Sequence, residues 1–444
     1  MARLFGTDGV RGVANTELTC DLAFKLGQAA VVFKGKTILV GKDTRLSGDM
    51  LESCVAAGIM SMGGTALLAG IIPTPAIALL VRELHCDGGI VISASHNPPE
   101  YNGIKLFDGQ GFKLPDAVED EIEAFVARGG ATADEMPAGD AVGVALPVED
   151  AVELYIAHAV STVTDEGIDF KGLKVALDVG HGASCMTSAE ALRRLGAEVV
   201  VINEEFDGTD INVNCGSTHL GPVRDLVVEI GADVGIAHDG DADRVMLVDA
   251  SGNEIDGDVV EAVCAIDFKQ RGLLAGNTAV STVMCNLGLV HAMREAGIQL
   301  IQTKVGDRYV LEAMREGGYV LGGEQSGHMI LLEHNSTGDG LVTALQFLAA
   351  CKRAEKSVAE AASIMTRFPQ TLINVRVRDK HALDGNEAVA AAVATVEAEL
   401  GEDGRVLIRP SGTEPVVRVM VEAASAEEAE RHARVIADVV EREV

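Results

Sequence analysis

The chain has 444 residues, 48% of them apolar, which is enough for about three domains that each bury a core. It carries 67 Asp and Glu against 36 Lys and Arg, and the net charge of −31 argues against a surface that binds nucleic acid or an anionic membrane. An anionic ligand would therefore need a local basic pocket.

The eight cysteines are scattered without a C-x-x-C pair, which favours reduced, mostly buried thiols in a cytosolic protein and argues against a zinc site. The start MARLFGTDGVRG has no basic segment followed by an apolar run, so we expect no signal peptide. The longest apolar run, residues 64–81, is interrupted by Pro73 and Pro75 and fits strand, loop and helix better than a membrane span. We therefore expect a cytoplasmic protein without a membrane anchor.

Apolar runs repeat three times along the chain, each time in the order strand, helix, strand, helix, strand. This alternation indicates parallel α/β domains, in which ligands bind beyond the carboxyl ends of the strands. A polar loop follows the third run of each unit, so the three loops could share one cleft. The third runs are residues 89–93, 233–238 and 319–323, and runs expected to return as antiparallel strands are residues 104–107, 245–248 and 329–332.

The pattern changes after Phe368 to a strand, a helix, a hairpin and a helix, which indicates a small α+β domain. Between the first two units, residues 127–143 are rich in Gly and Ala, and residues 147–164 are expected to form an amphipathic connecting helix. The predicted domains are residues 1–155, 156–253, 254–367 and 368–444.

The first candidate site is the stretch VISASHNPPEYNGIK, residues 91–105. The apolar run at residues 90–92 predicts a buried strand, which puts Ser95 at its carboxyl tip. Pro98 and Pro99 stiffen the loop and remove two backbone donors. Such a loop can hold a hydroxyl in a fixed place, although Ser-His-Asn is equally an ordinary loop cap.

A hydrolase triad is disfavoured at this loop. Ser95 lacks the G-x-S-x-G surround of a nucleophile elbow. His96, its neighbour in a segment expected to be extended, should point to the opposite side and therefore be poorly placed as its base.

The second candidate site is DGDADR, where Asp239, Asp241 and Asp243 stand two residues apart. In an extended segment all three carboxylates would lie on one face, a set of oxygen ligands suited to a divalent cation. An EF-hand is excluded because Arg244 and Ala250 stand where its loop needs Gly and Glu. The alternative is an acidic surface turn, but a buried strand precedes the cluster, and Arg244 suits a phosphate beside a metal.

Two later loops carry weaker signals. GGEQSGH, residues 322–328, offers Glu324 and Ser326 for sugar hydroxyls and His328 for a phosphate or a proton. The hairpin IRPSGTEP can cradle a phosphate with hydroxyls, backbone donors and guanidinium groups, although a plain β-turn explains it as well. The hairpin groups are Arg409, Ser411, Gly412, Thr413 and Arg418.

Three more motifs, GTDGVRG, KDTR and TKVGDRYV, add Arg11, Arg45 and Arg308 as further cations. A surface salt bridge is the default expectation for each of these arginines.

The four loops SASHNP, DGDADR, GGEQSGH and RPSGTEP, in that order and spacing, resemble those of the α-D-phosphohexomutase superfamily over nearly the whole chain. The resemblance implies three topologically similar α/β domains and a C-terminal α+β domain around a central active-site cleft. Gln325, the segment INVNCGSTH at residues 211–219 and the FGTDGVRG start are most similar to the bacterial phosphoglucosamine mutases. One departure is His181 in DVGHGAS, where an Asn is expected, and it leaves the catalytic assignment untouched.

The resemblance also implies roles for individual residues. Ser95 would be the phosphorylated residue, required for activity, and would join Asp239, Asp241 and Asp243 in binding one Mg²⁺ per active site. The implied catalytic residues are Ser95, His96, Lys105, Arg11 and His328, with Lys105 or Arg11 preferred for acid/base work. The implied substrate-binding residues are Arg244, Glu324, Ser326, Arg409, Ser411, Gly412, Thr413 and Arg418.

Together these expectations describe an isomerase that interconverts glucosamine 6-phosphate and glucosamine 1-phosphate through a 1,6-bisphosphate, for amino-sugar nucleotide and cell-wall precursor synthesis. Its partner would be a small amino-sugar phosphate, with no nucleic acid or membrane, and a homodimer is left open. The alternatives are phosphoglucomutase or phosphomannomutase activity, a silent sugar-phosphate binding protein, and a metal-dependent phosphatase using the same serine. Isomer formation without release of inorganic phosphate separates a mutase from the last two.

Overall fold

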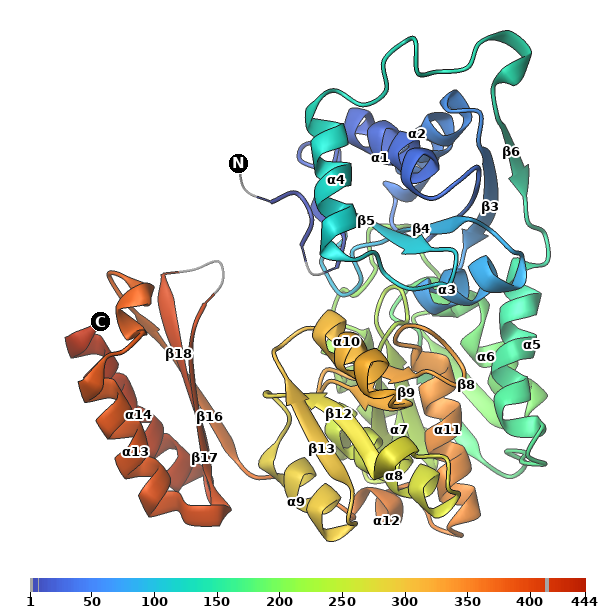
Figure 1. Cartoon of the computed structure of the whole chain (residues 1–444). Helices are drawn as coiled ribbons and strands as arrows, with labels where there is room; N and C mark the ends of the chain where they lie inside the picture. The colour runs from blue at the N-terminus through green and yellow to red at the C-terminus, as the bar shows by residue number, and fades with distance from the viewer. Residues whose placement is uncertain (1–2, 7, 412–414) are drawn as a thin grey trace. The chain divides into compact units, whose positions relative to one another are not determined.

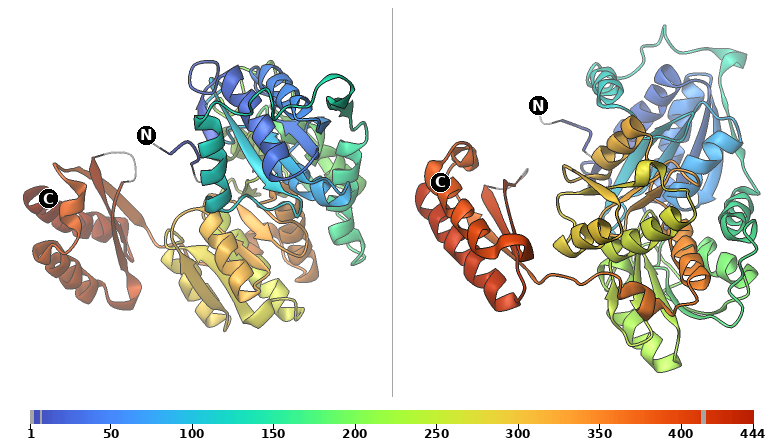
Figure 2. Two further views of the ribbon diagram at one scale, coloured as in Figure 1. Left: turned by 45° about the horizontal axis from the view of Figure 1, so that its top comes forward. Right: turned by 60° about the horizontal axis from the view of Figure 1, so that its bottom comes forward.

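The computed structural model describes residues 3–6, 8–411 and 415–444. The chain divides into two compact units (Figures 1 and 2), one formed by Met1–Met284 with Ile298–Ile364 and the other by Cys285–Gly297 with Met365–Val444. Each unit is described by itself below.

The first sheet runs in the order β1 (Val10–Val13), β5 (Tyr101–Asp108), β4 (Gly88–Ile92), β2 (Thr37–Lys42), β3 (Thr65–Ile71) and β6 (Val144–Pro147). Its centre is parallel, whereas β5 returns antiparallel to β4, as the sequence predicts. The helices around it are α1 (Cys20–Phe33), α2 (Gly48–Ser61), α3 (Thr74–Glu83) and α4 (Asp116–Ala127). Helix α5 (Ala151–Thr164) follows β6 in the chain and packs against α3 and against helices of the second and third sheets.

Two glycines let helices α1 and α2 pack closely. A Cβ at Gly27 would lie 2.2 Å from the carbonyl oxygen of Val55, and one at Gly58 would lie 2.1 Å from that of Phe24. Both distances are far below van der Waals contact, so any side chain at these positions would push the helices apart.

The second and third sheets repeat the parallel centre and the antiparallel return. The second runs in the order β11 (Glu254–Ile255), β10 (Val245–Asp249), β9 (Val234–His238), β7 (Lys174–Asp178) and β8 (Glu198–Ile202). The third runs in the order β13 (Gln299–Thr303), β12 (Thr278–Thr282), β14 (Leu321–Gly323) and β15 (Met329–Leu331). Their helices are α6 (Ser188–Arg194), α7 (Gly221–Ile230), α8 (Gly257–Gln270), α10 (Asp307–Gly317), α11 (Gly340–Arg353) and α12 (Val358–Ala362).

The second unit contains an antiparallel sheet in the order β16 (Gln370–Arg376), β18 (Val416–Glu422) and β17 (Arg405–Pro410). Val417, Val419 and Val421 alternate along β18 and are fully buried, as expected when one face of a sheet is covered. The covering helices α13 (Glu387–Leu400) and α14 (Ala426–Glu443) lie on one side of this sheet in Figure 2. This unit also contains α9 (Leu287–Glu295).

The fold class is confirmed: three similar α/β sheets with helices are followed by a small α+β part. The predicted start of one helix is wrong, because the helix expected from residue 147 begins only at Ala151, after the edge strand β6. Strand β6 pairs in parallel with β3, a long-range contact that a local helical pattern cannot reveal. Within the described ranges, none of the helices has both the length and the apolar character of a membrane span.

Candidate active site

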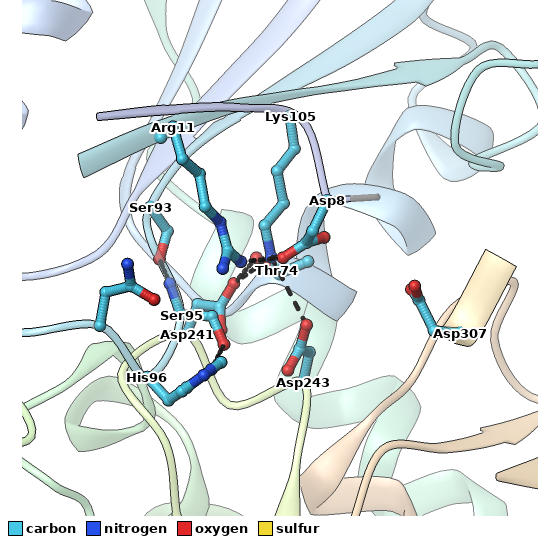
Figure 3. A network of polar contacts seen from close by, with 12 residues as sticks. Asp8, Arg11, Thr74, Ser93, Ser95, His96, Lys105, Asp241, Asp243 and Asp307 are labelled. Atoms are coloured by element: carbon cyan, nitrogen blue, oxygen red, sulfur yellow. Dashed lines mark hydrogen bonds and ion pairs between the residues drawn. The ribbon is translucent and has the colours of Figure 1, made fainter. Parts of the chain in front are cut away.

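The carboxyl ends of β4 and β9 bring the serine loop and the aspartate loop together. The Oγ of Ser95, which follows β4, donates a hydrogen bond of 2.5 Å to Oδ2 of Asp239, which follows β9. Figure 3 shows Ser95 of the first loop with Asp241 and Asp243 of the second. The aspartate loop also contacts the start of α3, where Oγ1 of Thr74 donates to Oδ2 of Asp241 at 2.6 Å. Ser95 and Asp239, which are 144 positions apart in the sequence, thus share one buried site.

The backbone at Ser95 is not extended, so the expected orientation of His96 is wrong. Ser95 adopts a left-handed conformation with φ 52°, and its Oγ lies 3.3 Å from Nδ1 of His96. The left-handed residue removes the alternation of an extended strand, and the two neighbouring side chains meet on the same side.

His96 is held in the neutral form. Burial, together with the positive charges of Arg244 and Arg11, lowers its pKa to about 4. At neutral pH its ring nitrogens can therefore exchange hydrogen bonds with Ser95, but the ring carries no charge.

The three aspartates converge through a turn and not through the extended segment predicted from their spacing. The N–H of Ala242, which has φ 54°, bonds the carbonyl of Asp239 at 3.1 Å. Carboxylate oxygens of Asp239, Asp241 and Asp243 nevertheless lie within 4.8 Å of one another, and all three residues are buried.

These carboxylates fit a divalent cation. Burial and the nearby charges of Asp243 and Asp241 hold the pKa of Asp239 well above its usual value. The Oδ1 atoms of Asp241 and Asp243 are buried and have no hydrogen-bond partner among the described residues. Unpaired buried carboxylate oxygens are costly unless a cation or a proton joins them, and hard oxygen ligands are those that Mg²⁺ prefers.

Lys105 provides a buried positive charge beside the aspartates. Its Nζ lies 2.8 Å from Asp241, 3.0 Å from Asp8 and 3.5 Å from Asp243. Burial works against the charge, but these carboxylates outweigh it and raise the pKa of Lys105 above its usual value. The ammonium group therefore stays charged and is suited to stabilise negative charge.

Three residues that the motif analysis passed over extend this network. Asp8 accepts a hydrogen bond of 2.5 Å from Lys113, which also pairs with Asp307 (Figure 3 shows Asp8 and Asp307). Asp307 in turn lies 3.6 Å from Nε2 of His328, whose Nδ1 is 3.6 Å from Asp243. Asp8 and Asp307 stand in GTDGVRG and TKVGDRYV, where attention to the arginines alone missed them, and Lys113 carried no motif signal.

Next to this network is a cavity of about 230 Å³. Glu324 is fixed at its edge, where Oε1 accepts from the N–H of Gly306 at 3.1 Å and Oε2 accepts from Ser326 at 3.4 Å. Cationic and carboxylate side chains together suit a ligand with both phosphate and hydroxyl groups. The lining includes Arg11, His96, Arg244, Asp307, Glu324 and His328.

The other predicted arginines are engaged differently. Arg308 pairs with Glu119 at 2.6 Å and with Asp116, in agreement with the expected salt bridge. Arg11 pairs with Asp8 in the network above. The expectation of a surface salt bridge is wrong for Arg45, because this residue is buried and only 2% exposed.

In the second unit, Arg409 on β17 is the direct cross-strand partner of Arg418 on β18. Burial and the charge of Arg418 lower the pKa of Arg409. Like charges opposite each other in a sheet repel, so this pair favours an anion beside it. Ser411 is buried in the same hairpin, whereas Gly412 and Thr413 lie outside the described residues.

Comparison with known proteins identifies the family. Models described as phosphoglucomutase/phosphomannomutase match the chain in four successive parts: α/β/α domain I at residues 2–132, domain II at 153–252, domain III at 256–368 and the C-terminal domain at 372–439. The phosphoglucosamine mutase of Clostridium novyi is 52% identical over 99% of this chain and 99% of its own length. That of Carboxydothermus hydrogenoformans is 52% identical over the full length of both. The chain belongs to the phosphoglucosamine mutases of this family.

Solved structures share the fold of this mutase family. A phosphoglucomutase/phosphomannomutase family protein from Burkholderia thailandensis matches with a TM-score of 0.80 and 24% identity over 98% of both chains. N-acetylphosphoglucosamine mutase of Aspergillus fumigatus, in complex with GlcNAc-6P and magnesium, matches with a TM-score of 0.69 and 16% identity over 99% of this chain and 95% of that one. The full-length relatives and the four family models confirm the expected family and enzyme class: the chain is a mutase, which is an isomerase.

Proposed function

We propose that the chain interconverts glucosamine 6-phosphate and glucosamine 1-phosphate through a phosphorylated Ser95. The observation that carries this proposal is the contact of Ser95 Oγ with Asp239 inside a buried cluster of three carboxylates. The full-length relatives named phosphoglucosamine mutase support the choice of sugar.

In the proposed reaction, Ser95 passes its phosphoryl group to the free hydroxyl of the sugar phosphate. The bond between phosphorus and Oγ breaks, a bond to the sugar oxygen forms, and the hydroxyl proton leaves to a base. The resulting 1,6-bisphosphate turns over, and Ser95 takes back the other phosphoryl group. Bound Mg²⁺, held by Ser95, Asp239, Asp241 and Asp243, would offset charge on the transferring group.

The remaining site residues have proposed roles in the same step. Lys105 and Arg11 are the proposed groups for proton transfer, and the raised pKa of Lys105 keeps its side chain positively charged beside the transferring group. His96, His328 and Arg244 orient the transferring phosphoryl group. Glu324 and Ser326 grip sugar hydroxyls between the two phosphates.

A bisphosphate that turns over must be held at one phosphate while the other faces Ser95, so a second anion site is needed. We assign this distal clamp to the C-terminal hairpin, with the opposed Arg409 and Arg418 as its charged groups. Ser411, Gly412 and Thr413 complete the proposed clamp.

The biological setting is part of the proposal. The products would feed amino-sugar nucleotide and cell-wall precursor synthesis in the cytoplasm, where free thiols such as those of the eight cysteines remain reduced. Nucleic acid and membranes are not proposed as partners, and a homodimer is left open.

We retain the domain boundaries at residues 155, 253 and 367.

The choice of sugar is tested by rates. At equal concentration, glucosamine 6-phosphate should be turned over at least tenfold faster than glucose or mannose 6-phosphate, with no release of inorganic phosphate. A coupled assay for each 1-phosphate, with a parallel phosphate assay, measures both quantities. Equal rates on all three sugars would refute the amino-sugar assignment, and stoichiometric phosphate release would point to the phosphatase alternative.

Replacing Arg409 by alanine tests the distal clamp. A charge-assisted hydrogen bond is worth about 1.5–3 kcal/mol, so Arg409→Ala should weaken substrate binding by roughly tenfold to a hundredfold. Substrate titration of the variant measures the loss, and Mg²⁺ affinity should stay unchanged. The matched control is Arg434→Ala, since Arg434 is an exposed arginine on α14 that pairs with Glu430 in a surface contact, and such contacts contribute little. Equal affinity in both variants would remove Arg409 from the clamp.

A further inference from the structure

Arg45 uses four of its five donors on the segment that contains Ser95. A guanidinium group has five N–H donors, and each here has an acceptor at 2.5–2.9 Å. Four of these acceptors are backbone carbonyls between the end of β4 and the first residue of β5, and the fifth is a carboxylate that offsets the charge. The acceptors are the carbonyl oxygens of Ser95, Asn97, Pro98 and Tyr101 and Oδ2 of Asp43.

Asn212, on the loop after β8, reaches two of the same carbonyls from the second sheet's side. Its Nδ2 donates to the carbonyl of Ser95 at 2.9 Å and to that of Asn97 at 3.2 Å. Gly240 closes the contact, because a Cβ there would lie 2.7 Å from the Ser95 carbonyl and 3.0 Å from Asn212 Nδ2. The loop is therefore clamped between two domains with no space for a further side chain.

The clamp holds a residue whose backbone is unfavourable. Ser95 has φ 52°, which non-glycine residues rarely adopt unless surrounding contacts impose it. Its N–H is also fixed, since it donates to Ser93 Oγ at 2.9 Å, and Ser93 donates to Asp43 at 2.5 Å. Both backbone polar groups of Ser95 are thus held, and its Oγ is directed at Asp239.

We infer that Arg45 and Asn212 are positioning residues of the phosphoryl transfer, which hold Ser95 in its left-handed conformation by binding the carbonyls of Ser95 and Asn97 from two domains. The inference rests on the proposed role of Ser95 as the phosphorylated residue. Phosphoryl transfer needs an in-line arrangement, and a displacement of about 1 Å can cost on the order of a hundredfold in rate. Loosening the clamp should therefore lower kcat and leave KM nearly unchanged, because neither residue is assigned to the sugar.

Asn212→Asp is the sharpest test, because it keeps the shape of the side chain, removes both donors and sets a negative charge against two carbonyls. We expect kcat to fall by roughly tenfold to a hundredfold, with KM within about twofold. The rate at which a hexose 1,6-bisphosphate phosphorylates Ser95, monitored by intact-mass measurement, should fall by the same factor. The matched control is Asn214→Asp, since Asn214 is an exposed residue of the same loop with φ 55° and should behave like the parent chain.

Arg45→Lys is a second test of the positioning role. A lysine has three donors on one nitrogen and cannot reach five acceptors spread around a planar fork, so kcat should fall at least as far as in Asn212→Asp. The combination Arg45→Lys with Asn212→Ala should lose less than the product of the single losses, because the two residues share acceptors.

The outcomes separate this inference from a purely structural role. Parental kcat in Asn212→Asp, or a loss that merely follows the folded fraction measured by thermal unfolding, would overturn it. If Arg45→Lys does not fold, the Asn212 variants alone decide the matter. Peptide mapping of the parent chain tests the underlying assignment separately, because phosphate on any residue but Ser95 would remove the proposed function and not merely the clamp.

Discussion

Replacing Ser95 by alanine is expected to lower mutase turnover by about three orders of magnitude or more. The proposed reaction routes both phosphoryl transfers through Ser95 Oγ, and no other hydroxyl can replace a nucleophile that carries the group covalently. Binding of the sugar phosphate should persist, since the cavity lined by Arg244 and Glu324 is untouched.

The Ser95→Ala variant should remain folded. A second substitution is useful because residue 95 has a left-handed backbone conformation. Alanine at φ 52° is strained, as serine is, whereas glycine adopts this conformation freely. Ser95→Gly removes the same Oγ and relieves the strain. Both variants should therefore be inactive, and Ser95→Gly should unfold at least as high in temperature as Ser95→Ala.

The neighbouring Ser93 is the main competitor for the phosphate. Its Oγ already donates to Asp43 and accepts from the N–H of Ser95, whereas the Oγ of Ser95 contacts the aspartate cluster at Asp239. Peptide mapping of the phosphorylated chain should therefore find the group on Ser95. Ser53→Ala, at an exposed hydroxyl on α2, is the control and should keep full activity. Phosphate on Ser93, or near-normal turnover of both Ser95 variants, would exclude the assignment.

The fold could be predicted because its signals are local and repeated. Each third apolar run, such as β4 or β9, ends in a polar loop and is followed by a returning strand, and those runs agree with the structure to within one or two residues. Ser95 and the three aspartates were found for the same reason, since they follow such strands directly.

The rest of the site depends on information that local patterns do not carry. The left-handed conformation of Ser95 is imposed by distant groups such as Arg45 and Asn212, so the orientation of His96 could not be inferred from alternation. Lys113 joins Asp8 and Asp307, which are 105 and 194 residues away in the chain. No spacing rule connects such residues, and each looks like an ordinary surface charge in the sequence.

Removing magnesium should abolish turnover, and adding it back should restore activity. The physical reason is the repulsion within the cluster of Asp239, Asp241 and Asp243, whose oxygens lie within 4.8 Å of one another. The raised pKa of Asp239 shows how strongly the folded site disfavours a third negative charge in the absence of a cation. Protons and the divalent ion compete for the same carboxylates, so the affinity for Mg²⁺ should fall as the pH is lowered.

Calorimetry on chelator-treated protein tests this without relying on activity. Mg²⁺ should bind with one ion per chain, and titrations at two pH values should show weaker binding at the lower pH. Asp241→Asn removes one negative charge from the cluster, at a carboxylate whose Oδ1 has no hydrogen-bond partner among the described residues. This substitution should weaken Mg²⁺ binding at least tenfold, which corresponds to about 1.4 kcal/mol. Asp225→Asn, at an exposed carboxylate on α7, should leave the affinity unchanged. Full turnover in the presence of chelator, or parental Mg²⁺ affinity in Asp241→Asn, would show that the cluster is not the metal site.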